Sequence, residues 1–363
     1  MDALAMTPRS DASDGSGISG TSDAFGAISG AVRAHLDDAL AAWLRPRTAA
    51  AVAVSAEAGA AAIALERLSL RGGKRVRAVL VAAGYIASGG EDWTDVVPAM
   101  VGIELLQTYL LIHDDWMDQD PVRRGGPAVH AELRDRFGGV AAGDAGAVLA
   151  GDLACAFAQA ALLETPLEPA RVLRAARVFA GIQEEVVVGQ LSEMRVVRDG
   201  PALSVEEVHA RKTASYTVTG PLSLGAVLAG ADDARVASLA RFGRQLGVAF
   251  QLRDDLLGVF GDPDATGKPV GNDLRQGKET ALVAAMRPSP TLERVLGRPE
   301  ATDAEIAAVV AEMERSGAKA RVEARLSELL AEARASVDAL ELPNEKGRMM
   351  LRGAVDALGA RAS

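Results

Sequence analysis

"LLIHDDWMDQD", residues 110–120, joins the end of a long apolar run to four carboxylates, at Asp114, Asp115, Asp118 and Asp120. The apolar part favours a helix buried in the protein core. On such a helix Asp114 and Asp118 lie four residues apart and share one face, with Asp115 at its shoulder. Carboxylates at this spacing repel one another. The pattern therefore indicates either a solvated acidic helix end or a face that holds cations.

The same pattern occurs a second time along the chain. "FQLRDDLLGVFGD", residues 250–262, ends an amphipathic apolar run in Asp254 and Asp255. Two acidic helix faces that oppose each other can hold a metal cluster between them. Oxygen ligands in ones and twos, without a His or Cys cluster, suit Mg²⁺ that also binds substrate phosphates.

Basic residues lie close to both acidic motifs and in one stretch upstream, "LRGGKRVRAVL". They are Lys74, Arg75, Arg77, Arg123, Arg124, Lys268 and Lys278. In the upstream stretch two glycines open a predicted helix, which lets backbone N–H groups approach an anion while Lys and Arg donate charge-assisted hydrogen bonds. Each cluster alone is more simply a solvated surface. Three clusters beside two Mg²⁺-type motifs predict diphosphate binding.

Composition and absent motifs exclude several other functions. Across 363 residues the net charge of −10 disfavours nucleic acid or an anionic membrane surface as the main partner. One cysteine, Cys155, excludes an internal disulfide framework and a Cys-rich metal site. The P-loop, dinucleotide-binding and EF-hand patterns are missing. With neither a membrane-spanning run nor a signal peptide pattern, we expect a cytoplasmic protein without stable membrane anchoring.

The fold class is predicted to be all-α. Residues 1–24 are rich in Ser, Gly and Asp and read as a disordered tail, whereas no linker divides residues 25–363, which we expect to form one domain. The predicted helices span residues 25–44, 50–69, 74–88, 95–119, 140–162, 168–198, 204–218, 221–231, 233–259, 277–287, 302–315, 317–340 and 344–359.

In eight ordered blocks the chain resembles the trans-isoprenyl diphosphate synthases, the polyprenyl synthetase family. The blocks are "GGKRVR" (72–77), "LIHDDWMD" (111–118), "RRGGPAVH" (123–130), "GDLA" (151–154), "GQLSE" (189–193), "KTASYTVTGPLSLGA" (212–226), "FQLRDDLLG" (250–258) and "TGKPVGNDLRQGKET" (266–280). The resemblance implies a single large helical bundle of the isoprenoid synthase type around a central apolar cavity. It also implies a homodimer and a Mg²⁺-dependent condensation of isopentenyl diphosphate with an allylic diphosphate.

The family's site residues carry over onto matching positions. Asp114, Asp118 and Asp254 are expected to bind Mg²⁺, three ions in all, with Asp115 and Asp255 supporting them. The allylic diphosphate is expected to contact Arg123, Lys212, Thr213, Gln251, Lys268 and Lys278. The isopentenyl diphosphate site is expected to consist of Gly73, Lys74, Arg77, Gln107 and Arg124. Gln190 and Glu193 match a Gln-x-x-Asp pair that lines the cavity.

Three positions depart from the family pattern. Gly258 replaces a third aspartate of the second motif, which removes an outer carboxylate but keeps Asp254. Glu193 is a longer acid where Asp is common. Gln107 stands where bacterial relatives often have His, and its amide can still donate to a phosphate oxygen.

Cavity depth is expected to set the product length. Tyr109, Leu110 and Leu106 precede Asp114 by one or two helical turns and point toward the growing tail. A bulky residue five before the first Asp resembles one class of geranylgeranyl diphosphate synthases, so we expect a C20 product, with C15 as the alternative. The simpler interpretation of Tyr109 is core packing.

Two further functions remain open. A class I terpene cyclase uses the same metal-triggered ionisation, but it lacks a use for the isopentenyl diphosphate residues and normally carries a different second metal motif. A non-catalytic subunit of a heteromeric synthase should have lost metal or phosphate residues, and here one outer aspartate is missing.

Overall fold

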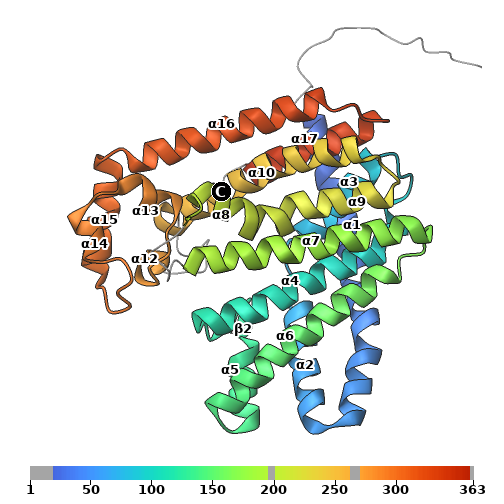
Figure 1. The fold of residues 1–363 in the computed structure, drawn as a ribbon, viewed down its shortest axis with the longest axis horizontal. Helices are drawn as coiled ribbons and strands as arrows, with labels where there is room; N and C mark the ends of the chain where they lie inside the picture. The colour runs from blue at the N-terminus through green and yellow to red at the C-terminus, as the bar shows by residue number, and fades with distance from the viewer. Residues whose placement is uncertain (1–18, 195–200, 262–269, 360–363) are drawn as a thin grey trace, which may run out of the picture.

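A computed structural model describes residues 19–194, 201–261 and 270–359, with side chains from Phe25 onward. Within these ranges the chain is helical apart from one short hairpin (Figure 1). The first half comprises α1 (Ser19–Val54), α2 (Ala56–Leu70), α3 (Val76–Ala87), η1 (Trp93–Val96), α4 (Val97–Asp118), β1 (Val122–Arg123), β2 (Gly126–Pro127), α5 (Val129–Phe137), α6 (Val140–Leu163) and α7 (Pro169–Met194). The second half comprises α8 (Val205–His209), η2 (Ala210–Thr219), α9 (Gly220–Leu228), α10 (Asp233–Phe260), α12 (Asn272–Arg275), α13 (Ala281–Met286), α14 (Pro290–Glu293), α15 (Asp303–Arg315), α16 (Ala318–Ala339) and α17 (Glu345–Gly359).

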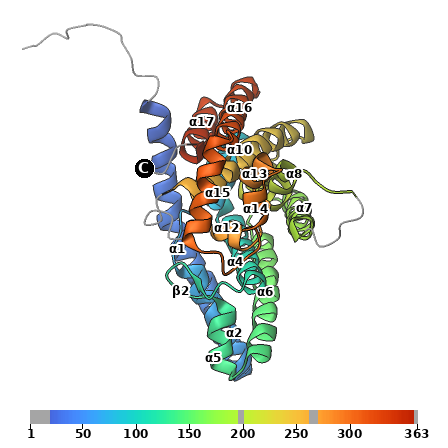
Figure 2. The same ribbon diagram turned by 90° about the vertical axis from the view of Figure 1, so that its left-hand side faces the viewer.

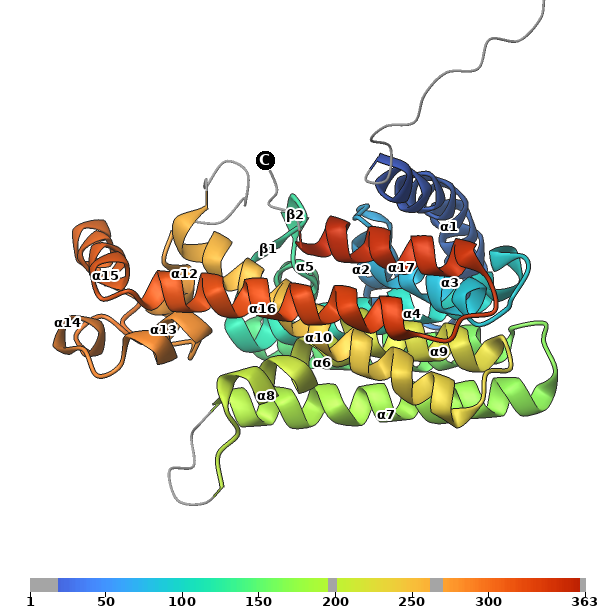
Figure 3. The same cartoon turned by 90° about the horizontal axis from the view of Figure 1, so that it is seen from above.

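The long helices form a layered bundle. Helix α4 packs against α3 and α6, while α10 packs against η2, α9 and α16. Helices α12 to α15 gather at one end of the molecule, and α2 and α5 extend to another side (Figures 1 and 2). Seen from above, α16 lies along α10 (Figure 3). Most helices contribute to a large apolar core, and a second buried cluster lies between the end of α10 and α13 to α16.

Helix α1 is longer than the sequence suggested. It begins at Ser19, inside the predicted tail, and continues through Pro46 to Val54, so the predicted break after residue 44 is wrong. Trp43 and Arg47 stack on each other, and both donate to Glu164 directly after the end of α6, which ties down the helix on either side of the proline. The break falls at Ser55, whose side chain accepts from Ala58 N and caps α2.

Other element boundaries also differ from the prediction. Helix α5 and the β1–β2 hairpin were not predicted, because their stretch is rich in Gly, Pro and Arg and too short for a clear period. The predicted helix 204–218 divides into α8 and the π-helical η2. Short helices α12 and α14 were missed, and α13 begins at Ala281 rather than near residue 277.

Two helical segments are long and apolar enough to cross a membrane, contrary to the expectation that none would be. They are Trp93–Asp118 and Val140–Leu163, with 61% and 44% of their most apolar windows buried inside the fold. Core helices of soluble proteins meet the same criterion. The first of the two ends in the acidic motif, so its apolar length belongs to the core.

Candidate active site

Helix α4 divides its aspartates between two environments. Asp115 has a fully buried side chain and accepts hydrogen bonds from the Arg123 guanidinium, with Nε at 2.7 Å. Asp114 and Asp118 keep side chains that are 32% and 22% exposed. Asp114 borders the apolar cavity described below, and Asp118 borders a second hollow that Lys278 also lines. The helix ends at Gln119, which adopts a left-handed conformation and turns the chain toward the arginines. The face predicted to bind cations is therefore the open one.

The hairpin after α4 sends two neighbouring arginines to different places. Arg124 and Gly125, with φ of 51° and 72°, form the tight turn between β1 and β2. Arg123 consequently reaches back to Asp115, whereas Arg124 donates through Nη1 to the Gly72 carbonyl at 2.9 Å.

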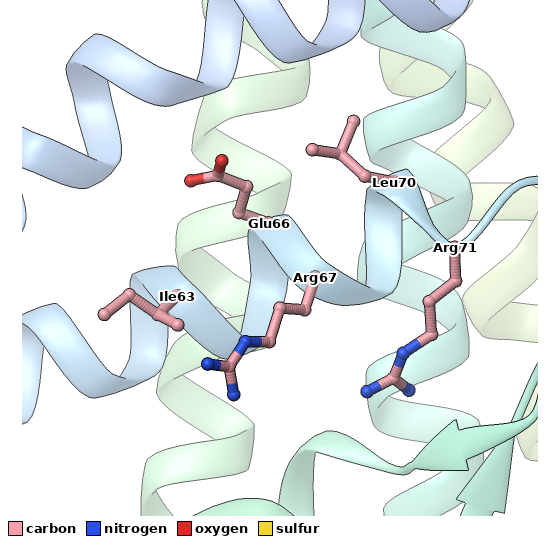
Figure 4. A pocket seen from close by; sticks show the side chains of 5 residues that line it. All are labelled: Ile63, Glu66, Arg67, Leu70 and Arg71. Atoms are coloured by element: carbon pink, nitrogen blue, oxygen red, sulfur yellow. The ribbon is translucent and has the colours of Figure 1, made fainter.

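Helix α2 holds this hairpin in position. Arg71, at the end of α2, donates to the Pro127 carbonyl at 2.6 Å and to the Arg123 carbonyl at 3.2 Å. Figure 4 shows Arg71 and Arg67 on one side of α2, with the hairpin strands passing below Arg71. They line a surface hollow of about 460 Å³ together with Ile63, Glu66 and Leu70. Both arginines of this hollow bond within the protein, Arg71 to the hairpin and Arg67 to Glu132, so we assign the hollow a structural role.

The second acidic motif, on α10, repeats the division of α4. Asp255 is buried and accepts from Gln251 Nε2 at 2.8 Å and from Ala281 N at 3.1 Å, with His209 Nε2 at 3.5 Å. Asp254 is 42% exposed at its side chain, with the Arg253 guanidinium 3.3 Å away. Gln251, predicted to contact the allylic diphosphate, is thus bonded to Asp255 in this structure.

Lys212 and Thr213 are carried by η2, which fits between α7 and α10. A Cβ on Gly189 of α7 would lie 2.4 Å from Lys212 N, and a Cβ on Gly247 of α10 would lie 2.4 Å from Ala214 Cβ. Neither distance is possible for real side chains, so both glycines are needed for this close approach. Isolated π-helical turns are frequent at functional sites because they redirect side chains.

The cations of the site are paired with its carboxylates. Lys212 Nζ donates to Glu193 and lies 3.9 Å from Asp114. Lys278 Nζ donates to Asp118 at 2.9 Å. The second of these bonds joins the first acidic motif to the segment between α12 and α13. The longer side chain of Glu193, one of the departures from the family pattern, is what reaches Lys212.

The predicted isopentenyl diphosphate residues come together at the start of α3. Gly72 and Gly73 have φ of 79° and 145°, and Lys74 is exposed directly before the helix. With its amide oxygen facing the arginines, Gln107 accepts from Arg77 Nη1 at 2.9 Å and from Arg124 Nη2 at 3.2 Å. The Gln107 NH₂ group then remains for a ligand.

Arg75, which the sequence placed among the phosphate-binding cations, instead anchors this loop. Its backbone is left-handed, with φ of 49°, and its side chain is only 2% exposed. It donates to Asp37 Oδ1 at 2.9 Å, Glu104 Oε2 at 3.0 Å and the Ser69 carbonyl at 2.9 Å. A buried arginine with three partners on three helices holds the backbone in a strained conformation that exposes the first N–H groups of α3.

An apolar cavity of about 260 Å³ lies between α4, α7 and η2, next to Asp114. Its walls are Tyr109, Leu110, Leu111, His113, Asp114, Met117, Val186, Val187, Gln190, Leu191, Met194, Lys212 and Tyr216. Tyr109 and Leu110 lie where the sequence predicted them. Leu106 does not: it is fully buried in the core and is not part of this wall.

Electrostatics at the site favour a bound cation. Burial, followed by the neighbouring Asp118, raises the pKa of Asp114, and burial raises that of Asp254. Burial opposes the charge of Lys278, but Asp118 outweighs it and raises the pKa of the lysine. Burial and the adjacent arginines lower the pKa of Arg124. A bound cation would stabilise carboxylates whose charge is unfavourable, and a bound anion would stabilise clustered guanidinium groups.

The donor set fits magnesium shared with a substrate. Asp114, Asp118 and Asp254 offer only oxygen, the ligand type that Mg²⁺ prefers. Within the described residues, no three His, Cys, Asp or Glu side chains are grouped closely enough to hold a metal by themselves.

One predicted site residue cannot be placed, and several residues near the site were not predicted. Lys268 lies outside the described residues, in the range 262–269. Glu104, Arg71 and His113 had no predicted role. Only Arg75 was marked by a local sequence pattern, as a third cation in "GGKRVR". Glu104 and Arg71 act through partners that are distant in sequence.

An all-α bundle with two aspartate-bearing helices, the first of which borders an apolar cavity, belongs to the isoprenoid synthase class. The chain matches the family model described as Polyprenyl synthetase over residues 60–313. It is similar to a geranylgeranyl diphosphate synthase of Methanosarcina mazei, with 34% identity over 76% of this chain and 82% of that protein. It is 39% identical to a geranylgeranyl diphosphate synthase of Mycobacterium tuberculosis over 59% of this chain and 58% of that one.

Among solved structures, it resembles geranylgeranyl pyrophosphate synthase from Corynebacterium glutamicum complexed with isoprenyl diphosphate and magnesium. The identity is 32% and the TM-score 0.82, over 90% of this chain and 98% of that chain. The chain therefore belongs to the polyprenyl synthetase family and is a prenyltransferase. The predicted all-α fold is confirmed. Other relatives are named farnesyl and geranylfarnesyl diphosphate synthases.

Proposed function

We propose that this enzyme condenses isopentenyl diphosphate head-to-tail with an allylic diphosphate, with Mg²⁺ as cofactor, and that its main product is geranylgeranyl diphosphate. The observation that carries the proposal is the presence of two separate cationic sites, the first of which adjoins the apolar cavity through Asp114 and Lys212. The first consists of Arg123, Lys212 and Lys278 beside the open aspartates, and the second of Lys74, Arg77 and Arg124 at the start of α3. Two diphosphates have one site each.

The allylic diphosphate would lie over Asp114, Asp118 and Asp254. Magnesium, when bound there, would neutralise the departing diphosphate, and we propose three ions as in the sequence-based expectation. Lys212 and Lys278, released from their carboxylates, donate hydrogen bonds to the same oxygens. Arg123 stays on Asp115 and adds charge from behind. Lys268 would join them, as the family pattern implies.

Isopentenyl diphosphate would be held by Lys74, Arg77, Arg124 and the Gln107 amide. The C–O bond of the allylic substrate breaks, and the double bond of isopentenyl diphosphate attacks the allylic carbon. The new cation then loses a proton, for which the released diphosphate is the nearest base. The apolar cavity excludes water that would otherwise capture the cation.

The product length would be set by Tyr109, which lines the cavity five residues before Asp114. An aromatic ring at this depth forms a floor, with Leu110 beside it. The curated relatives include both farnesyl and longer-chain synthases, so the C15 product is the alternative.

A direct incubation tests the proposal. The purified chain is mixed with Mg²⁺, isopentenyl diphosphate and allylic diphosphates of five, ten or fifteen carbons in turn, and the products are sized by chromatography. We expect geranylgeranyl diphosphate from all three. Turnover of an allylic diphosphate without isopentenyl diphosphate would favour a terpene cyclase, and no turnover at all would favour a non-catalytic subunit.

We also propose that residues 25–363 form one catalytic domain, that the enzyme is a homodimer and that it acts in the cytoplasm. Helix α6 supports the dimer, because Val140, Leu149 and Leu163 are 63%, 65% and 60% exposed along an otherwise apolar helix. Light scattering should give twice the chain mass, and Leu149→Glu should give single chains. A single-chain mass for the unmodified protein would overturn the dimer.

A further inference from the structure

His113 holds Tyr109 in place. The two rings meet edge to face, with centroids 4.8 Å apart and planes at 70°. Both side chains line the apolar cavity. Edge-to-face aromatic pairs are attractive because the positive ring edge meets the negative face of the partner. The position of Tyr109 therefore depends on where the imidazole sits.

The imidazole is in turn fixed to helix α6. Its Nε2 lies 3.1 Å from the Val148 carbonyl, at hydrogen-bond distance. Directly beneath it is Gly151: a Cβ at that position would lie 2.2 Å from His113 Nε2 and 2.4 Å from its Cδ2. The ring thus rests on bare backbone, and a Cβ at position 151 would force the ring to move.

We propose that His113, seated on Gly151 and bonded to Val148, is a positioning residue that sets the product length by clamping Tyr109 at the cavity floor. This inference rests on the proposed function, since it takes Tyr109 as the floor. It adds that the floor is a two-ring unit attached to α6, the helix that packs along α4.

Two single substitutions move the clamp in opposite directions. His113→Ala removes the ring that holds Tyr109, so the floor loosens and the ratio of products above C20 to C20 should rise roughly two- to tenfold. Gly151→Ala pushes the imidazole away from α6, toward Tyr109 and the cavity, so C15 should rise relative to C20. Gly181→Ala on α7 is the matched control, because a Cβ there meets nothing within 4 Å and should leave the ratio unchanged.

A double substitution separates this inference from the proposal beneath it. Product ratios are compared at equal conversion, so that a change of rate caused by the neighbouring Asp114 does not enter. Tyr109→Ala should lengthen the products, and adding His113→Ala to it should change nothing more. If Tyr109→Ala lengthens the products but His113→Ala and Gly151→Ala each leave them unchanged, the clamp is wrong and the floor stands.

If Tyr109→Ala itself has no effect, both the floor and the clamp are overturned. Further lengthening when His113→Ala is added to Tyr109→Ala would overturn the clamp as well, because the two rings would then act separately. Should His113→Ala fail to fold, Gly151→Ala decides alone: a shift toward C15 supports the clamp, and an unchanged ratio overturns it.

Discussion

The aspartates of the two motifs have different tasks although they are adjacent in sequence. Asp115 and Asp255 are buried acceptors that hold Arg123 and Gln251, while Asp114 and Asp254 remain open. Burial is unfavourable for the charges of Asp114 and Asp254, and Asp118 repels Asp114, so the site is less stable without its ligands than an uncharged site would be. Strain of this kind is typical of functional sites.

Asp114→Asn should stabilise the ligand-free protein while abolishing activity. Burial raises the pKa of Asp114, so the native state holds that proton more tightly than the unfolded chain does. In the unmodified protein, protonated Asp114 adds to stability below the ordinary carboxyl pKa. This contribution is lost as pH rises through the raised pKa of Asp114 in the folded state. Without metal, thermal unfolding should show a gain of about 0.5–2 kcal/mol at pH 7 that shrinks toward pH 4.

The exposed Asp135 on α5 provides the control for this experiment. Asp135→Asn should leave the unfolding temperature nearly unchanged at both pH values. A gain for Asp114→Asn that is equal at pH 4 and pH 7 would contradict the titration argument.

Removing Arg75 should destabilise the fold strongly. Its side chain and that of Glu104 are 2% and 1% exposed, so Arg75→Met leaves a buried carboxylate without its charge partner. Loss of one partner of a buried pair costs about 3–5 kcal/mol, measurable by chemical denaturation. Arg67→Met, at a pair whose arginine is 62% exposed, is the control and should cost less than about 1 kcal/mol. Arg75→Met with Glu104→Leu should recover part of the loss; no recovery would count against the pair.

Individual site residues could be predicted from the sequence where their spacing lies within a single helix. The spacing of Asp114 and Asp118 follows from helical geometry, and their exposure agrees with it. The partner of Arg123 was not predictable, because it depends on left-handed residues in the turn that follows. Leu106 was misplaced since a helical wheel shows direction but not how deep the cavity reaches.

At the scale of elements, the position of η2 depends on two glycines in other helices. Gly189→Ala should displace Lys212, because the new Cβ would lie 2.4 Å from its backbone nitrogen. We expect kcat to fall about tenfold or more and stability to fall by about 1–3 kcal/mol. Gly181→Ala on the same helix has open space and should be neutral or slightly stabilising. Equal activity of the two variants would show that η2 is not held this way.

Helix count and order were mostly predictable from apolar periodicity, but three features were not. The π-helical conformation of η2 comes from packing against α7 and α10 rather than from its own composition. Helix α1 crosses Pro46 because Trp43 and Arg47 make tertiary contacts with Glu164. The β1–β2 hairpin depends on Arg71 from α2, which no local pattern reveals.

At the scale of the molecule, the fold brings Lys278 against Asp118 and Lys212 against Glu193 from distant parts of the chain. Metal at Asp118 must displace Lys278 from that carboxylate, and diphosphate must draw both lysines away from their partners. Each ligand should therefore raise the affinity of the other by the same factor. Calorimetric titration should give a tighter Mg²⁺ affinity with inorganic diphosphate present than without it. Lys278→Gln should weaken this coupling, and an unchanged coupling would contradict the exchange.

The acceptor of His113 is the backbone carbonyl of residue 148, which every amino acid supplies. Replacing the side chain of Val148 leaves this acceptor unchanged. Substitutions can therefore alter the proposed clamp only at positions 109, 113 and 151. Two of the three positions tolerate few substitutions. A side chain at position 151 would collide with the His113 ring, and position 113 adjoins a carboxylate of the site. Descendants of this enzyme should therefore diverge in product length mainly through residue 109.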